Sequence, residues 1–139
     1  MFKVLSVLIF CLFLNFQTLA VEDGKYIGAW KTTYAHSEST SAKGDTGIFE
    51  FTIQDNKIVK IFTPDDPNLE SFKLKYFYKI NPKTNELHGY ALGYDASTSS
   101  RFRINLKGVF VNNKFAGEGN TELMPESLII DKFVFESIE

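Results

Sequence analysis

Residues Phe72–Ile80 read Phe-Lys-Leu-Lys-Tyr-Phe-Tyr-Lys-Ile, so apolar and polar side chains alternate along almost the whole segment. Side chains two residues apart point to the same face of a β-strand, and this alternation is therefore typical of a strand with one buried and one solvated face. The buried face is predicted to carry Phe72, Leu74, Tyr76, Tyr78 and Ile80, and the solvated face Lys73, Lys75 and Lys79, with Phe77 as the exception.

The same two-residue period recurs from Tyr26 to the C-terminus, and no segment shows helical periodicity. Short Asn-containing connectors such as Asp55-Asn56 and Asn112-Asn113 are typical of hairpin turns, which make consecutive strands antiparallel neighbours. We therefore predict an all-β fold, an antiparallel up-and-down barrel of about eight strands, because closure removes the sheet edges. A two-sheet β-sandwich is the alternative. The predicted strands are Tyr26–Ala35, Thr46–Gln54, Lys57–Thr63, Ser71–Ile80, Glu86–Tyr94, Ser100–Val111, Lys114–Leu123 and Ser127–Ser137.

The N-terminus has the features of a secretion signal. Lys3 precedes an apolar run over Val4–Phe16, which is shorter than the roughly 20 residues that a membrane-spanning helix needs. The run ends in Thr18-Leu19-Ala20, a small-x-small cleavage pattern, so we expect residues 1–20 to be a signal peptide and residues 21–139 to be one β-barrel domain. A retained N-terminal anchor helix is the alternative. The expected location is secreted or periplasmic, and Cys11, the only cysteine, would leave with the signal peptide.

Composition argues against several classes of function. The formal net charge of -2 gives no overall attraction to nucleic acid or to an anionic membrane, and no nucleic-acid partner is expected. There is no Gly-x-Ser-x-Gly motif, phosphate-binding loop or dinucleotide fingerprint, so no catalytic residue and no cofactor are assigned.

No metal site is predicted either. His36 and His88 are the only histidines, and neither has a second ligand at zinc-binding spacing. Oxygen-bearing side chains do gather between two prolines, which makes calcium an alternative to a stiff turn, although the spacing is not that of an EF-hand. These residues are Asp65, Asp66, Asn68 and Glu70.

The fifth predicted strand has one small and one large face. Leu87, Gly89, Ala91 and Gly93 alternate with His88, Tyr90, Leu92 and Tyr94. If the glycines face inward, they leave space beside Tyr76 and Tyr78 on the neighbouring strand. The candidate ligand-binding residues at the open end of the barrel are therefore Tyr76, Tyr78, Gly89 and Gly93. Two alternatives remain: the tyrosines crowd the lumen, or the glycines only allow a small barrel to coil tightly.

The opening of the first strand, Tyr26-Ile-Gly28-Ala-Trp30, resembles the Gly-x-Trp motif of the calycin barrels, the lipocalin and avidin group. The resemblance covers these five residues and the strand count. It implies a structural role for Gly28 and Trp30, with the Trp packed across the closed end of the barrel, and Trp30 joins the candidate ligand-binding residues. Biotin binding is not implied, because avidins use several tryptophans and this chain has one.

These observations give a leading hypothesis and two alternatives. The leading one is a non-enzymatic protein that holds a small apolar or aromatic ligand at the open end of a lipocalin-like barrel. The second is an interaction module or inhibitor that binds an acidic protein, glycan or lipid through the loop His36–Asp45 or through a basic and aromatic surface stripe. The third is an isomerase or cyclase, which would need acid-base groups in the lumen. The stripe comprises Lys73, Lys75, Lys79, His88, Tyr90, Tyr94, Arg101, Arg103 and Lys107, and the acid-base candidates are Glu118, Glu122 and Asp131.

Overall fold

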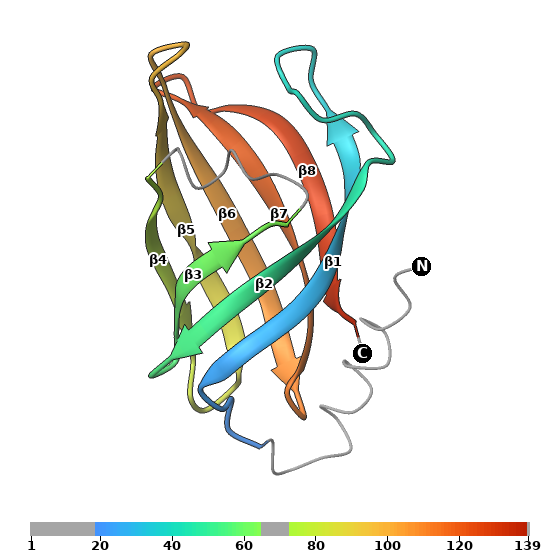
Figure 1. The fold of residues 1–139 in the computed structure, drawn as a ribbon, viewed down its shortest axis with the longest axis vertical. Coiled ribbons are helices and arrows are strands. Elements are labelled where there is room, and N and C mark those ends of the chain that lie inside the picture. The colour runs from blue at the N-terminus through green and yellow to red at the C-terminus, as the bar shows by residue number, and fades with distance from the viewer. Residues whose placement is uncertain (1–18, 65–72, 139) are drawn as a thin grey trace.

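The computed structural model describes residues 19–64 and 73–138, and in these ranges the chain forms one closed antiparallel barrel. Each strand pairs with the next along the chain, and β1 pairs with β8 to close the barrel (Figure 1). The up-and-down barrel is confirmed, and the β-sandwich alternative is wrong. The strands are β1 (Gly24–Ala35), β2 (Thr46–Gln54), β3 (Lys57–Phe62), β4 (Lys75–Ile80), β5 (Glu86–Asp95), β6 (Ser100–Val111), β7 (Lys114–Met124) and β8 (Leu128–Ser137).

Strand β4 is shorter than predicted. It begins at Lys75, and Lys73 precedes it with a φ of 49°, outside the range of extended backbone. Lys73 is exposed, but it is not part of the strand. The predicted start at Ser71 lies outside the described residues. Only two residue pairs join β3 to β4, Lys57 with Lys79 and Ile58 with Tyr78, so this is the shortest seam of the barrel.

The interior is filled by phenylalanine rings at the end of the barrel that carries the Asp55-Asn56 and Asn112-Asn113 turns. Phe49, Phe51, Phe115 and Phe135 are all buried, and the centroids of Phe49 and Phe51 lie 4.5 Å apart. Phe135 stands edge-on to both of these rings, with centroids at 5.9 and 6.1 Å. Such offset and edge-to-face contacts are the favoured geometries for aromatic pairs. This end of the lumen is therefore closed by packing.

Inward-facing glycines make room for these rings. A Cβ built on Gly28 would lie 2.6 Å from the Phe49 ring, and one on Gly117 would lie 2.6 Å from the Phe135 ring. An aromatic ring that covers a glycine on an adjacent strand buries apolar area that the glycine cannot supply. The volume gained at these glycines is thus taken up by aromatic side chains.

Residues 19–23 cross the closed end of the barrel before β1 begins. The Asn85 side-chain amide donates a hydrogen bond to the Leu19 carbonyl at 2.6 Å, and the Val21 side chain is buried in the core cluster. The Asp55 amide donates to Asp23 Oδ1 at 2.9 Å, which ties this segment to the β2–β3 turn. Among the residues described, no helix has the length and apolar character needed to cross a membrane.

Candidate functional site: a cavity at the open end of the barrel

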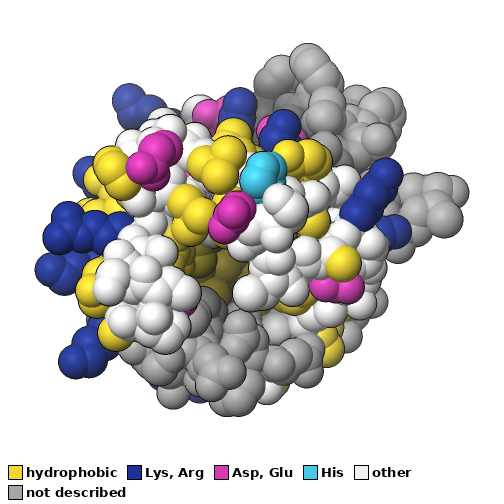
Figure 2. Space-filling model, turned by 90° about the horizontal axis from the view of Figure 1, so that it is seen from above, with side chains coloured by type: hydrophobic (Ala, Val, Ile, Leu, Met, Phe, Trp, Pro, Cys, Tyr) yellow, Lys and Arg dark blue, Asp and Glu magenta, His cyan; other side chains and the backbone are white. Residues whose placement is uncertain are grey.

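At the end opposite the Asp55-Asn56 and Asn112-Asn113 turns, the lumen widens into a cavity of about 180 Å³. Seen from above, Figure 2 shows it as a hollow lined mainly by hydrophobic side chains. Residues from β1, β2, β3, β6, β7 and β8 line it, together with Ser41 from the loop between β1 and β2, Thr63 just after β3 and Leu74 just before β4. The cavity lies directly above the phenylalanine core, because Phe49, Phe51 and Phe135 belong to both.

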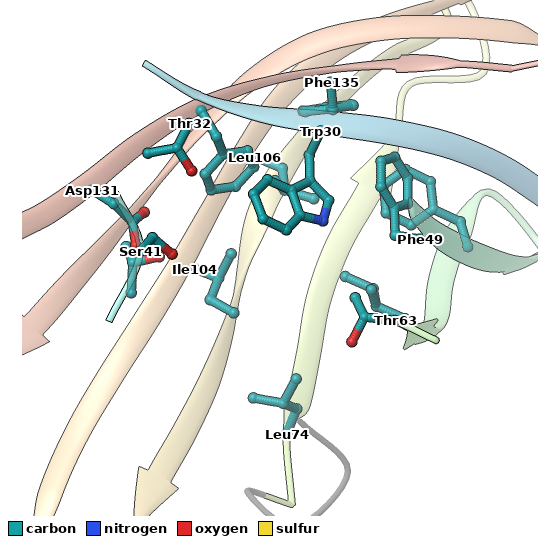
Figure 3. Close-up of a pocket in the computed structure, with 14 residues that line it drawn as sticks. Trp30, Thr32, Ser41, Phe49, Thr63, Leu74, Ile104, Leu106, Asp131 and Phe135 are labelled. Carbon is teal, nitrogen blue, oxygen red and sulfur yellow. The ribbon is translucent and has the colours of Figure 1, made fainter. Parts of the chain in front are cut away.

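The apolar wall of the cavity is built around Trp30, as Figure 3 shows. Its indole lies over Gly47, the residue paired with it on β2, and a Cβ at that position would be 2.5 Å from the ring carbon Cε2. Ile104 and Leu106 contribute aliphatic surface from β6. The calycin resemblance implied that Trp30 packs across the closed end of the barrel, but the structure does not place it there. The phenylalanines occupy that end, and Trp30 forms a wall of the open one.

A polar group of side chains lies at one side of the cavity. Thr32, Ser41 and Asp131 lie close to one another there in Figure 3, and Thr121 lines the cavity from β7. Asp131 faces inward because it shares the inner face of β8 with Phe133 and Phe135.

The loop after β1 is held against the barrel by backbone hydrogen bonds. The amide of Thr32 donates to the Asp45 carbonyl, and the amide of Gly44 donates to the Thr32 carbonyl, both at 2.8 Å. The Thr32 residue is buried at 3 % exposure. These bonds place Ser41 at the rim of the cavity.

The carboxyl group of Asp131 is the only ionisable side chain among the described residues that line the cavity. Burial raises its pKa, because desolvation disfavours the charged form, while hydrogen bonds involving Thr121 and Ser39 act in the opposite direction. Its Oδ1 atom is buried and has no hydrogen-bond partner in the described part of the chain. A buried carboxylate oxygen without a partner is energetically unfavourable.

The candidate ligand-binding residues on β4 and β5 lie elsewhere in the barrel. Tyr78 is fully buried in the core, and its hydroxyl donates to the Ile104 carbonyl at 2.7 Å. The Tyr76 hydroxyl lies 3.5 Å from the Ile61 carbonyl and spans the short β3–β4 seam. Neither tyrosine lines the cavity. Their phenol groups instead satisfy polar backbone inside the barrel wall.

Gly89 and Gly93 face inward as expected, but they leave no open space. A Cβ on Gly89 would lie 2.7 Å from the Cα atom of Tyr78, so the two backbones approach closely at this position. The ring of Phe102 covers Gly93, where a Cβ would be 2.7 Å from ring carbon Cε1. The expectation of a ligand space at these glycines is therefore wrong, while the alternative in which they serve barrel packing fits the geometry.

Sequence reasoning missed Thr32, Ser41 and Thr121, and it singled out Asp131 only as an acid-base candidate. The two-residue period contained the signal for three of the four. Thr32 follows Trp30 on the inner face of β1, Thr121 follows Gly119 on that of β7, and Asp131 precedes Phe133 on that of β8. The other two acid-base candidates, Glu118 and Glu122, point outward, and so cannot act inside the lumen.

The predicted basic and aromatic stripe does lie on the outer face of β4, β5 and β6, except for Lys73. The Arg103 guanidinium stands 4.6 Å from the centroid of the Tyr90 ring, and the Phe77 ring packs on the other side of Tyr90 at 5.2 Å. On the neighbouring strand β7, however, Glu122 lies opposite Arg103 in the strand register, and Glu118 lies opposite Lys107. These carboxylates border the stripe and offset its charge. The interaction hypothesis stays a prediction.

Metal-binding geometry is not found among the described residues, where no three His, Cys, Asp or Glu side chains gather. His36 Nδ1 accepts a hydrogen bond from the Glu38 amide at 3.1 Å, which gives this histidine a local role in the loop. The acidic segment considered for calcium, Asp65 to Glu70, lies outside the described residues.

Comparison with protein-family models, with curated proteins and with solved structures finds no match to this chain. Its function is therefore argued from the cavity itself.

Proposed function

We propose that this chain is an exported binding protein that holds one small, largely apolar ligand in the cavity at the open end of its barrel. The observation that carries the proposal is the cavity: the lumen is solidly packed at one end and hollow at the other, and the hollow is walled by Trp30, Phe49, Leu106, Phe133 and Phe135. Protein interiors normally pack without such voids, so a hollow of this size in an aromatic-rich core favours a ligand site.

The size of the cavity limits the ligand. An apolar cavity of about 150 Å³ admits benzene, whereas drug-sized ligands occupy pockets of about 300 Å³ or more. At about 180 Å³, this cavity suits one aromatic ring or a short aliphatic group. A fatty acid or a polycyclic compound would have to extend out of the barrel mouth.

Apolar contact alone gives such a ligand little affinity. A side chain as large as Phe buries roughly 150 Å² or more, which at about 25 cal/mol per Å² is worth about 4 kcal/mol. Association costs about 4 kcal/mol or more in lost translational and rotational freedom. A ligand of one-ring size therefore needs a polar contact as well, and the cavity has polar groups in Thr32, Ser41 and Asp131.

Two further features support the remaining parts of the proposal. The apolar segment Val4–Phe16, followed by Thr18-Leu19-Ala20, has the form of a signal peptide and supports export to a secreted or periplasmic location. The closed eight-stranded barrel is compatible with a calycin-like fold, in which an open barrel end serves as the ligand site. A lipocalin-like mode of binding is thus the working model, in which residues lining the cavity replace the candidates on β4 and β5.

Trp30 gives a direct test of the proposal, because it is the only tryptophan and it lines the cavity. We expect the neutral probe 2-phenylethanol to change the fluorescence of mature protein in a saturable, one-to-one titration. In Ile104→Phe the larger side chain projects into the cavity and should abolish this titration. Thermal melting should show that the variant is folded, since filling a void does not require the barrel to open.

Val59→Phe is the matched control, because Val59 on β3 is 42 % exposed and does not line the cavity. It should titrate like the wild type. Absence of saturable binding of any one-ring probe to the folded wild-type protein would refute the proposal, as would full binding by folded Ile104→Phe.

A further inference from the structure

The cavity combines an aromatic wall with an ionisable group, the carboxyl of Asp131, and this combination restricts the chemistry of its ligand. Asp131 Oδ1 is buried without a hydrogen-bond partner in the described part of the chain. The described residues that line the cavity include no lysine, arginine or histidine, so none of them can neutralise a carboxylate at this position. The nearest lysine in sequence, Lys132, lies on the outer face of β8, with its ammonium 5.8 Å from the centroid of the Tyr34 ring.

A carboxylate in such a place is normally compensated by a cation. Burying an unpaired charge is strongly unfavourable, and a hydrogen-bonded counter-charge recovers much of that cost. Leucine or valine at this position would complete an apolar cavity, because Phe133 and Phe135 already occupy the next two inward positions of β8. The aspartate thus gives the cavity one acidic and one aromatic side.

We infer that the ligand of this cavity is a small primary amine, bound as its ammonium ion, with a single aromatic ring or a short apolar group attached. The inference rests on the proposed function and specifies its ligand class. The ammonium group donates to Asp131 Oδ1, with the hydroxyls of Thr32 and Ser41 on the same side of the cavity (Figure 3).

The apolar part of the ligand then lies against Trp30 and the aliphatic side chains of β6. The Trp30 indole also attracts a cation that comes within about 6 Å of its face. Because the polar side chains and the indole both border the same small cavity, one short molecule reaches both. An anion of the same shape would face the Asp131 carboxylate with no compensating cation among the lining residues that the structure describes.

Three probes of nearly equal shape test this inference at pH 7: 2-phenylethylamine, 2-phenylethanol and phenylacetate. Calorimetric titration of the mature protein should give the tightest binding for the amine and the weakest for phenylacetate. Asp131→Asn keeps the shape of the side chain and removes its charge, and it should weaken amine binding by about 10- to 100-fold, the range for a charge-assisted hydrogen bond. The same substitution should leave 2-phenylethanol within about threefold of its wild-type affinity, because that neutral probe forms no ion pair.

Glu126→Gln is the matched control, because Glu126 is exposed in the β7–β8 turn at the same end of the barrel and does not line the cavity. It should leave the affinity for the amine unchanged. Equal affinities for amine and alcohol, or an Asp131→Asn variant that still prefers the amine, would overturn the inference while leaving the proposed function intact. If none of the three probes binds to the folded protein, the proposed function fails together with the inference.

Discussion

Replacing Phe135 by alanine tests how the barrel core is built. Phe135 is 1 % exposed, and its ring contacts Phe49 and Phe51 edge-on and Phe115 at a centroid distance of 6.1 Å. It also covers Gly117, so the glycine provides no side chain to fill the space left by the ring. The strands around it are held by the barrel's hydrogen bonds, so they can move in only partly to close the void.

The expected cost follows from this environment. Replacing a buried Phe by Ala typically lowers the free energy of unfolding by about 3–5 kcal/mol, and the loss grows with the volume of the void that remains. We expect Phe135→Ala to lose about 4 kcal/mol, a large part of the roughly 5–15 kcal/mol that stabilises a domain of this size. In urea, with a slope of about 2 kcal/mol per molar, the unfolding midpoint should fall by about 2 M at an unchanged slope. Far-ultraviolet circular dichroism is the appropriate probe, because Trp30 fluorescence would report on the altered cavity as well.

Phe77→Ala provides the comparison, since the same residue type lies on the outer face of β4 at 47 % exposure. Its ring contacts Tyr90 on the outside of the barrel, so the loss should be about 1 kcal/mol or less. If the two substitutions cost the same, or if Phe77→Ala costs more, the assignment of inner and outer faces is wrong.

Two other predictions address the glycines and the buried carboxyl group. Gly89→Ala should destabilise the protein more than Gly93→Ala, because the Cβ at residue 89 meets the backbone of Tyr78 at a φ of 138°, whereas the Cβ at residue 93 meets only the ring of Phe102, which can tilt. Urea midpoints measure the difference, and a smaller loss for Gly89→Ala would contradict the close approach of the two strands. Burial raises the pKa of Asp131, so the folded protein keeps the carboxyl proton of Asp131 at pH values where the unfolded chain has lost it. The contribution of Asp131 to stability therefore falls as pH rises from about 3.9, the ordinary pKa of an aspartate. Asp131→Asn should therefore unfold at higher urea than the wild type at pH 7, with the advantage lost below about pH 4; an advantage that grows on acidification would show that the pKa is lowered instead.

The fold could be predicted from the sequence because two-residue alternation is a local property of each strand. The bounds of β2 and β6 agree with prediction, as do the turns at Asp55-Asn56 and Asn112-Asn113, whose asparagines adopt positive φ. The start of β4 was wrong, because alternation extends through Lys73 although the backbone there is not extended. Alternation reports which face a side chain occupies, but it does not report where hydrogen bonding begins.

The position of the site was harder to predict, because it depends on which inward side chains share a level of the barrel. Gly93 indicated free space as long as its neighbours across the sheet were unknown, and the register then placed Phe102 against it. The cavity arises where Trp30 and Asp131, about a hundred residues apart in the chain, reach the same end of the lumen. This meeting depends on the closing pair β1 and β8, which no local pattern specifies.

The central claim is that the open end of the barrel holds a cavity with an apolar wall formed by Trp30, Ile104 and Phe135. Diffraction from a crystal of the mature chain under xenon pressure tests it most directly, because xenon binds to the apolar surfaces of cavities of about this size. The account predicts a xenon peak beside the Trp30 indole in wild-type protein and none in Ile104→Phe. A wild-type crystal with no xenon at this position, and with Trp30 packed directly against Ile104, would contradict it.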